Sequence, residues 1–78
     1  MKFSKDKLKK ELLREAKVLG IQPGAAEILA ERVVLATEKW AKRQTMITEN
    51  DLNRAVAKEA KKYNADLAYV YQNRGKII

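Results

Sequence analysis

Apolar side chains recur along this 78-residue chain at the three- and four-residue spacing of α-helices, with a capping signal before each run. At the first signal, Ser4 can accept hydrogen bonds from the free N–H groups of a first helical turn, and Phe3 can pack on Leu8. One face then carries Leu8, Leu12, Ala16 and Leu19. We expect this helix to stop at Gly20, a residue suited to a left-handed C-cap.

A second helix is predicted over residues 23–43, with Pro23 in its first turn. Apolar residues occupy most of its circumference, so we expect it to be the central helix around which the others pack. A narrow polar stripe is expected on its outward side and consists of Glu27, Glu31, Glu38 and Lys42.

A third helix is predicted to begin at Thr48, where Asp51 occupies the capping-box position and Ile47 can pack on Leu52. Its predicted inner face consists of Leu52, Val56, Ala60 and Tyr63. A short fourth helix is expected over residues 65–74, ending at Gly75. With no alternating strand pattern, the sequence predicts one all-α domain over residues 1–78, a small four-helix orthogonal bundle with the second helix at its centre.

Several chemistries are excluded by composition. The chain has neither Cys nor His, which removes disulfides, thiol and imidazole catalysis and the usual zinc sites. No glycine-rich phosphate loop is present, and the single Ser lies at a predicted helix cap. The acidic pairs Glu27 with Glu31 and Glu49 with Asp51 fall at exposed or capping positions. We therefore expect a protein that is not an enzyme and uses no cofactor or metal.

No segment resembles a membrane span. The longest apolar run covers residues 33–36, far below the ~20 residues that a span requires, and residues 1–12 lack the apolar centre of a signal peptide. We expect an intracellular, cytoplasmic protein without a membrane partner.

Positive charge dominates, with 17 Lys and Arg against 10 Asp and Glu and a net charge of +7. Helical spacing gathers it into two basic ridges: an N-terminal ridge of Lys7, Lys10, Arg14 and Lys17, and a third-helix ridge of Arg54, Lys58 and Lys61. Each ridge is interpreted either as the solvated outer face of a helix or as a surface that follows nucleic-acid phosphates. No aromatic residue interleaves with either ridge, so base stacking is not expected. The core is the expected place for Trp40, Tyr63, Tyr69 and Tyr71, and a ligand-stacking site formed by them is the alternative.

The order of signals from Phe3 to Arg74 resembles the helical part of the ATP-cone domain, a regulatory module of ribonucleotide reductases. The resemblance runs through Phe3, Lys7-Leu8, Glu15-Ala16, Ala26-x-x-Leu29-Ala30-x-x-Val33, Ile47-Thr48-Glu49-Asn50-Asp51-Leu52-x-x-x-Val56 and Ala68-x-x-Tyr71-x-x-Arg74. The family's nucleotide-holding β-hairpin has no counterpart ahead of the first helix. The resemblance therefore implies a four-helix module that acts through protein contact, such as a homodimer, or through a phosphate-bearing ligand, more than through a nucleotide.

A shorter stretch is similar to the second loop of the histone fold. It joins Lys42-Arg43-Gln44-Thr45 at the end of the middle helix to Ile47-Thr48-Glu49-Asn50-Asp51-Leu52 at the start of the next. This likeness implies dimerisation, with DNA held by loops and basic helix faces. We expect first a non-catalytic, basic helical binding module of the ATP-cone type, and as the alternative a small histone-like DNA-binding protein.

Overall fold

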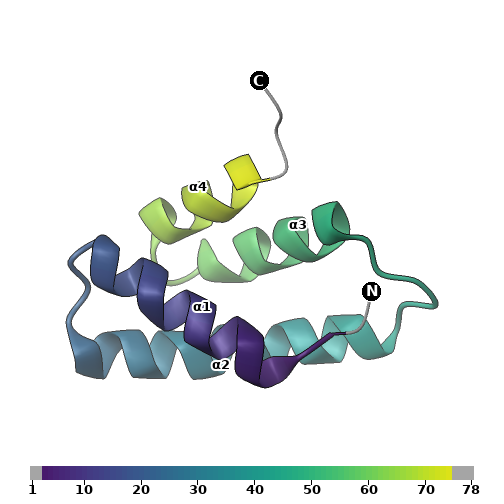
Figure 1. The fold of residues 1–78 in the computed structure, drawn as a ribbon, viewed down its shortest axis with the longest axis horizontal. Coiled ribbons are helices and arrows are strands. Elements are labelled where there is room, and N and C mark those ends of the chain that lie inside the picture. Colours follow the sequence, from purple (N-terminus) through teal and green to yellow (C-terminus); the bar gives the residue numbers. More distant parts are fainter. Residues whose placement is uncertain (1–2, 75–78) are drawn as a thin grey trace.

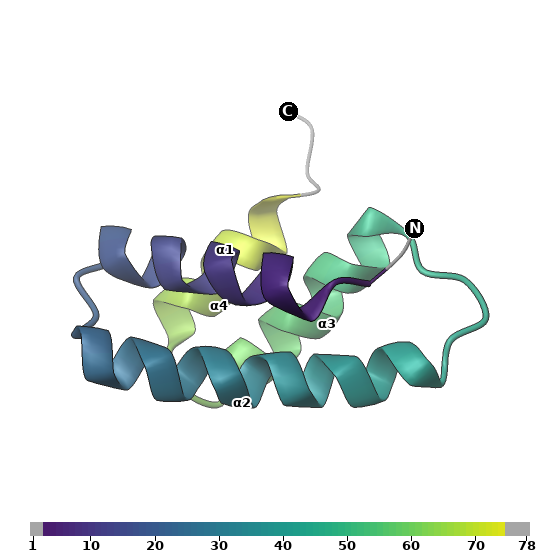
Figure 2. The ribbon, with the colours of Figure 1, turned by 60° about the horizontal axis from the view of Figure 1, so that its bottom comes forward.

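A computed structural model describes residues 3–74, which form four α-helices and no strand: α1 (Lys5–Val18), α2 (Pro23–Lys42), α3 (Glu49–Ala60) and α4 (Ala65–Arg74). The chain reverses direction at each connection, so that α1 with α2 and α3 with α4 form two helical hairpins (Figure 1). The hairpins run obliquely to each other (Figure 2). The predicted all-α four-helix bundle is confirmed.

The helix boundaries follow the capping signals. The Ser4 hydroxyl accepts a hydrogen bond from the backbone N–H of Lys7 at 3.3 Å, and the Thr48 hydroxyl accepts one from that of Asp51 at 3.1 Å. α1 ends at Val18, and Gly20 follows with φ +77°, the left-handed conformation expected of it. α2 ends at Lys42, one residue before the predicted end. The predicted end of α4 at Gly75 lies outside the described residues.

α2 packs against α1 on one side and α3 on the other, while α4 packs mainly on α3. One continuous core fills the space between the helices. Its largest fully buried side chains are Leu12, Val33, Val56, Leu67 and Tyr71. The Thr37 hydroxyl is also fully buried, and it has no hydrogen-bond partner among the described residues.

Two residues predicted to face inward are exposed. Leu19 retains 37% of its accessible surface and Tyr63 retains 45%, because each lies beyond the last residue of its helix, where the helical spacing no longer applies. Tyr69 is 66% exposed as well, and Trp40 is half-buried. The expectation that all four large aromatics lie in the core is therefore wrong, and only Tyr71 is enclosed.

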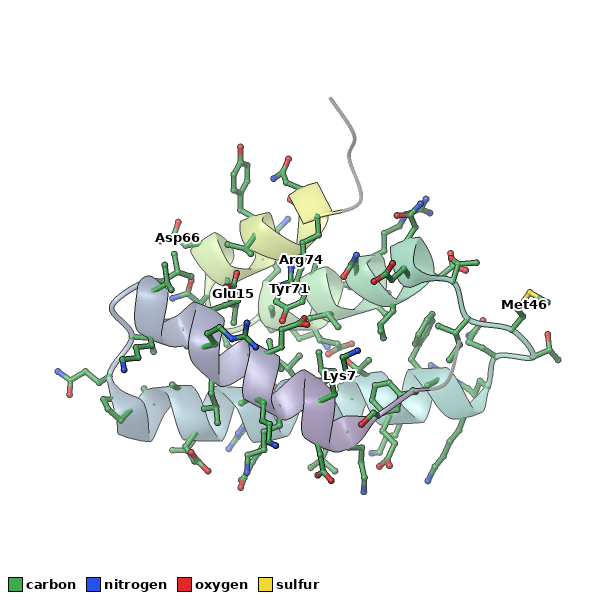
Figure 3. The ribbon with its side chains drawn as sticks, in the orientation of Figure 1. Lys7, Glu15, Met46, Asp66, Tyr71 and Arg74 are labelled. Carbon is green, nitrogen blue, oxygen red and sulfur yellow. The ribbon has the colours of Figure 1, made fainter. Side chains whose placement is uncertain are left out.

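A polar contact fastens α4 to α1. The Tyr71 hydroxyl donates a 2.9 Å hydrogen bond to the Glu11 carboxylate, which also binds the guanidinium group of Arg74. That guanidinium lies 4.7 Å from the centre of the Tyr71 ring. Both side chains point from α4 toward α1 in Figure 3. The two hairpins are thus joined by a charged hydrogen-bond network in addition to the core.

None of the helices in residues 3–74 is long and apolar enough to cross a membrane.

Candidate functional site

The lysines of α1 fall into two groups, one of which is paired with α2. Lys5 binds Glu38 at 3.3 Å, and Lys9 binds Glu27 at 3.3 Å and Glu31 at 3.7 Å. Hydrogen bonding and charge attraction to Glu27 raise the pKa of Lys9. The predicted acidic stripe of α2 therefore does not stand alone in solvent, because its three carboxylates are partly neutralised by α1.

The other cations of α1 belong to the predicted N-terminal ridge, and like those of the predicted third-helix ridge they are exposed. Within residues 3–74, every ridge residue is exposed and none forms an ion pair, as holds for Lys7, Lys10, Arg14, Lys17, Arg54, Lys58 and Lys61. Each of these charges remains available to an external anion. The charge on the bundle is thus divided between cations used internally and cations left free.

The two ridges border different hollows. Lys7 lines a hollow of about 180 Å³ between α1, α3 and α4, which Glu11 and Glu49 also line. Arg54 and Lys58 line a groove of about 400 Å³ between α2 and α3. Neither hollow is lined by Lys10, Arg14, Lys17 or Lys61. Neither of these two hollows therefore brings the two ridges together.

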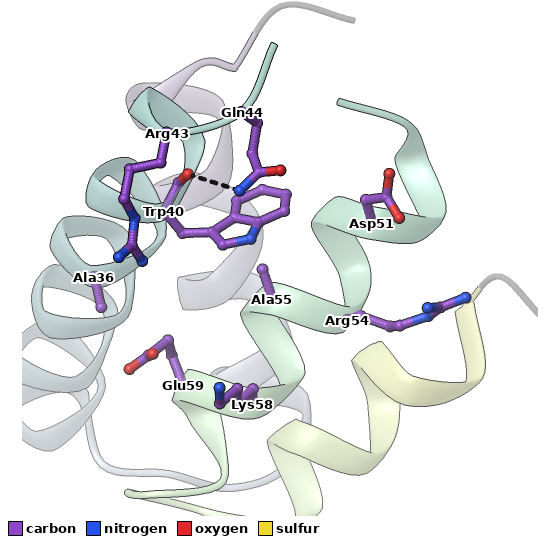
Figure 4. A pocket seen from close by; sticks show the side chains of 9 residues that line it. All are labelled: Ala36, Trp40, Arg43, Gln44, Asp51, Arg54, Ala55, Lys58 and Glu59. Atoms are coloured by element: carbon purple, nitrogen blue, oxygen red, sulfur yellow. Dashed lines mark hydrogen bonds between the residues drawn. The ribbon is translucent and has the colours of Figure 1, made fainter. Parts of the chain in front are cut away.

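The α2–α3 groove has a half-buried interior and an exposed rim (Figure 4). Small side chains at facing positions, Ala36 on α2 and Ala55 on α3, leave the space open between the helices. The remaining half-buried lining residues are Trp40, Asp51 and Glu59, and the exposed ones are Arg43, Gln44, Arg54 and Lys58. The groove thus brings an aromatic ring and two carboxylates together with three cationic residues, of which Arg54 points away from the ring (Figure 4).

Trp40, which the sequence placed in the core in preference to a ligand-stacking site, is the aromatic residue of this groove. Its indole ring reaches from α2 toward α3 above Ala55, and its ring N–H donates to no acceptor among the described residues (Figure 4). Beside it, the Gln44 side chain donates a long, exposed hydrogen bond of 3.4 Å to the Trp40 carbonyl oxygen. Contrary to the sequence-based expectation, an aromatic ring does accompany ridge cations, because α2 supplies the ring and α3 the charges.

The sequence also contains a third basic row, on α2, which the helical spacing of its residues indicates. Arg32, Lys39 and Arg43 lie within about 40° of one another at about 100° per residue. All three are exposed and make no ion pair within the described part of the chain. α2 therefore has an acidic edge toward α1 and a separate row of cations, one of which, Arg43, reaches the groove.

The carboxylates of the candidate site have structural neighbours. Glu59 pairs with Lys62 at 3.1 Å, and Asp51 lies in the first turn of α3, where the helix N-terminus favours negative charge. In residues 3–74, no group of three acidic side chains is arranged to hold a metal ion. Family models, curated proteins and solved structures were compared with this chain, and none of them matches.

Proposed function

We propose that this chain is a non-catalytic binding module that holds the phosphates of a nucleic acid with the free cations of α1 and α3. The observation that carries the proposal is the division of charge on α1. Lys5 and Lys9 are paired with α2, whereas the four ridge residues of the same helix have no partner in residues 3–74.

The spread of these cations favours a polyanion over a compact ligand. The α1 ridge runs from Lys7 to Lys17, ten steps of about 1.5 Å along the helix, or about 15 Å. A nucleic-acid strand presents a phosphate about every 3.4 Å, so several phosphates can meet one ridge. Binding of this kind releases condensed counterions and needs no sequence-specific contact.

Salt titration of duplex DNA binding tests this function. Affinity should fall steeply as salt rises, and neutralising Lys10→Gln with Arg14→Gln should weaken binding and flatten the slope by about 2, because each lost phosphate contact removes about 1. The pair Lys10→Arg with Arg14→Lys keeps both charges and should leave the slope unchanged. Absence of duplex binding in dilute buffer would refute the proposal.

A nucleotide-responsive module of the ATP-cone type is the second candidate. It is favoured by the α2–α3 groove, whose volume of about 400 Å³ lies in the range of small-molecule sites, about 300 to 1,000 Å³. Trp40 could stack an adenine there, with Arg43 and Lys58 near its phosphates. Calorimetry with ATP and dATP tests this candidate. Saturable binding that Lys58→Gln weakens would support it, and no heat with either nucleotide would reject it.

A further inference from the structure

We infer that the α2–α3 groove takes an unpaired base of single-stranded nucleic acid, with the base on the Trp40 ring and the flanking phosphates on the rim. The phosphates of such a strand would bind unpaired surface cations, as in the proposed function, and this role of the groove therefore rests on that function. It goes further by assigning a preference for single strands over duplexes, which the ridges alone do not provide.

The layout of the groove matches the two parts of a nucleotide. Its half-buried lining includes the Trp40 indole ring and the small side chains of Ala36 and Ala55, and the ring is an apolar surface on which any base can stack. Its exposed rim carries Arg43 from α2, and Arg54 and Lys58 from α3. A base placed inside therefore has its backbone at the rim, between cations from both helices.

The polar groups of the interior also suit a base. The free indole N–H of Trp40 is a donor, and the carboxylates of Asp51 and Glu59 are acceptors for base N–H groups. Both carboxylates would repel phosphates, which favours the backbone at the rim rather than inside. Because Glu59 is paired with Lys62, part of this repulsion is relieved.

A base in a duplex cannot reach the indole. Stacking on a side chain in this groove requires the base to leave its own stack, which single strands permit and duplexes resist. The duplex therefore meets the exposed ridges only, while a single strand meets the ridges and the groove. This difference separates the inference from the proposed function.

Trp40 is the only tryptophan of the chain, so its intrinsic fluorescence reports on the groove directly. The probes are a labelled oligothymidylate and an abasic strand of the same length, which has the same phosphates and no bases. Oligothymidylate should quench the fluorescence and bind about 5- to 150-fold more tightly by anisotropy, the range expected for one stacked base. The abasic strand should bind as weakly as Trp40→Leu binds either strand.

Two further variants keep the test decisive if Trp40→Leu fails to fold. Trp40→Phe retains an aromatic ring and should keep most of the preference for oligothymidylate. Ala55→Leu keeps helix propensity and fills the groove, so it should remove the preference and leave duplex binding intact. Equal affinity of the wild-type protein for both strands would overturn the inference while leaving the proposed function standing. Absence of binding to the duplex and to both strands would overturn both.

Discussion

The two sides of α2 differ in whether their charged side chains are paired. Toward α1, its acidic edge is paired with Lys5 and Lys9. Toward α3, the groove cations Arg43, Arg54 and Lys58 form no ion pair within the described residues, and small side chains hold the groove open. The comparison shows that the bundle compensates charge where helices must stay together and leaves it free beside an accessible aromatic ring.

The largest effect is expected from emptying the core on the α1 side. Leu12 is fully buried, and Leu12→Ala should lower the free energy of unfolding by about 3 kcal/mol, through lost burial and the cavity left behind. Urea denaturation measures this loss. Ala55→Leu in the groove should change the free energy by less than about 1 kcal/mol, because the added atoms enter open space. A comparable loss in both variants would show that the groove is closed core, contradicting the comparison.

The next largest effect is expected at the side-chain hydrogen bond between α4 and α1. Tyr71→Phe removes the hydroxyl that donates to Glu11 and should cost about 1.5 kcal/mol, since the acceptor is a charged carboxylate. Tyr69→Phe is the matched control in the same helix, because the Tyr69 side chain is 66% exposed, and its effect should be close to zero. Equal losses in the two variants would mean that the contact with Glu11 stabilises nothing.

The same tyrosine gives the bundle a dependence on alkaline pH. Burial, and then the negative charge of Glu11, raise the pKa of Tyr71 well above the ordinary value of 10.0. The folded protein therefore keeps this proton after the unfolded chain has lost it. The stability from Tyr71 is fully present below about pH 10 and falls as pH rises further. Unfolding followed from pH 8 to 11 should show a steeper loss for the wild type than for Tyr71→Phe.

A smaller effect, of opposite sign, is expected inside the core. Thr37→Val replaces a fully buried hydroxyl that lacks a partner in residues 3–74, and should raise the free energy of unfolding by about 1 kcal/mol. Thr37→Ser keeps the hydroxyl, removes a methyl group and should destabilise. Destabilisation by Thr37→Val in urea denaturation would show that the hydroxyl has a partner in solution.

Capping residues and helical spacing were sufficient to predict the fold from the sequence. The site depends on contacts between helices, which these local patterns do not give. Ser4 and Thr48 fixed two helix starts because a cap depends on neighbours three residues away. Leu19 and Tyr63 were misplaced because the helical spacing was continued past the helix ends. The groove could not be predicted from the sequence, since Trp40 comes to line one groove with residues of α3 only after α2 and α3 pack together.

The smallest predicted effect tests whether paired and free lysines differ in solution. Lys9→Gln breaks two contacts with α2, whereas Lys10→Gln removes an adjacent charge that has no partner in the described residues. Because the pairs are exposed and screened by salt, Lys9→Gln should lower Tm slightly in dilute buffer and not at all in 1 M salt. Lys10→Gln should leave Tm unchanged or slightly higher, since it relieves repulsion in a chain of net charge +7. Identical Tm values for the two variants at low salt would mean that α1 does not distinguish structural cations from free ones, and the contrast between the two sides of α2 would fail.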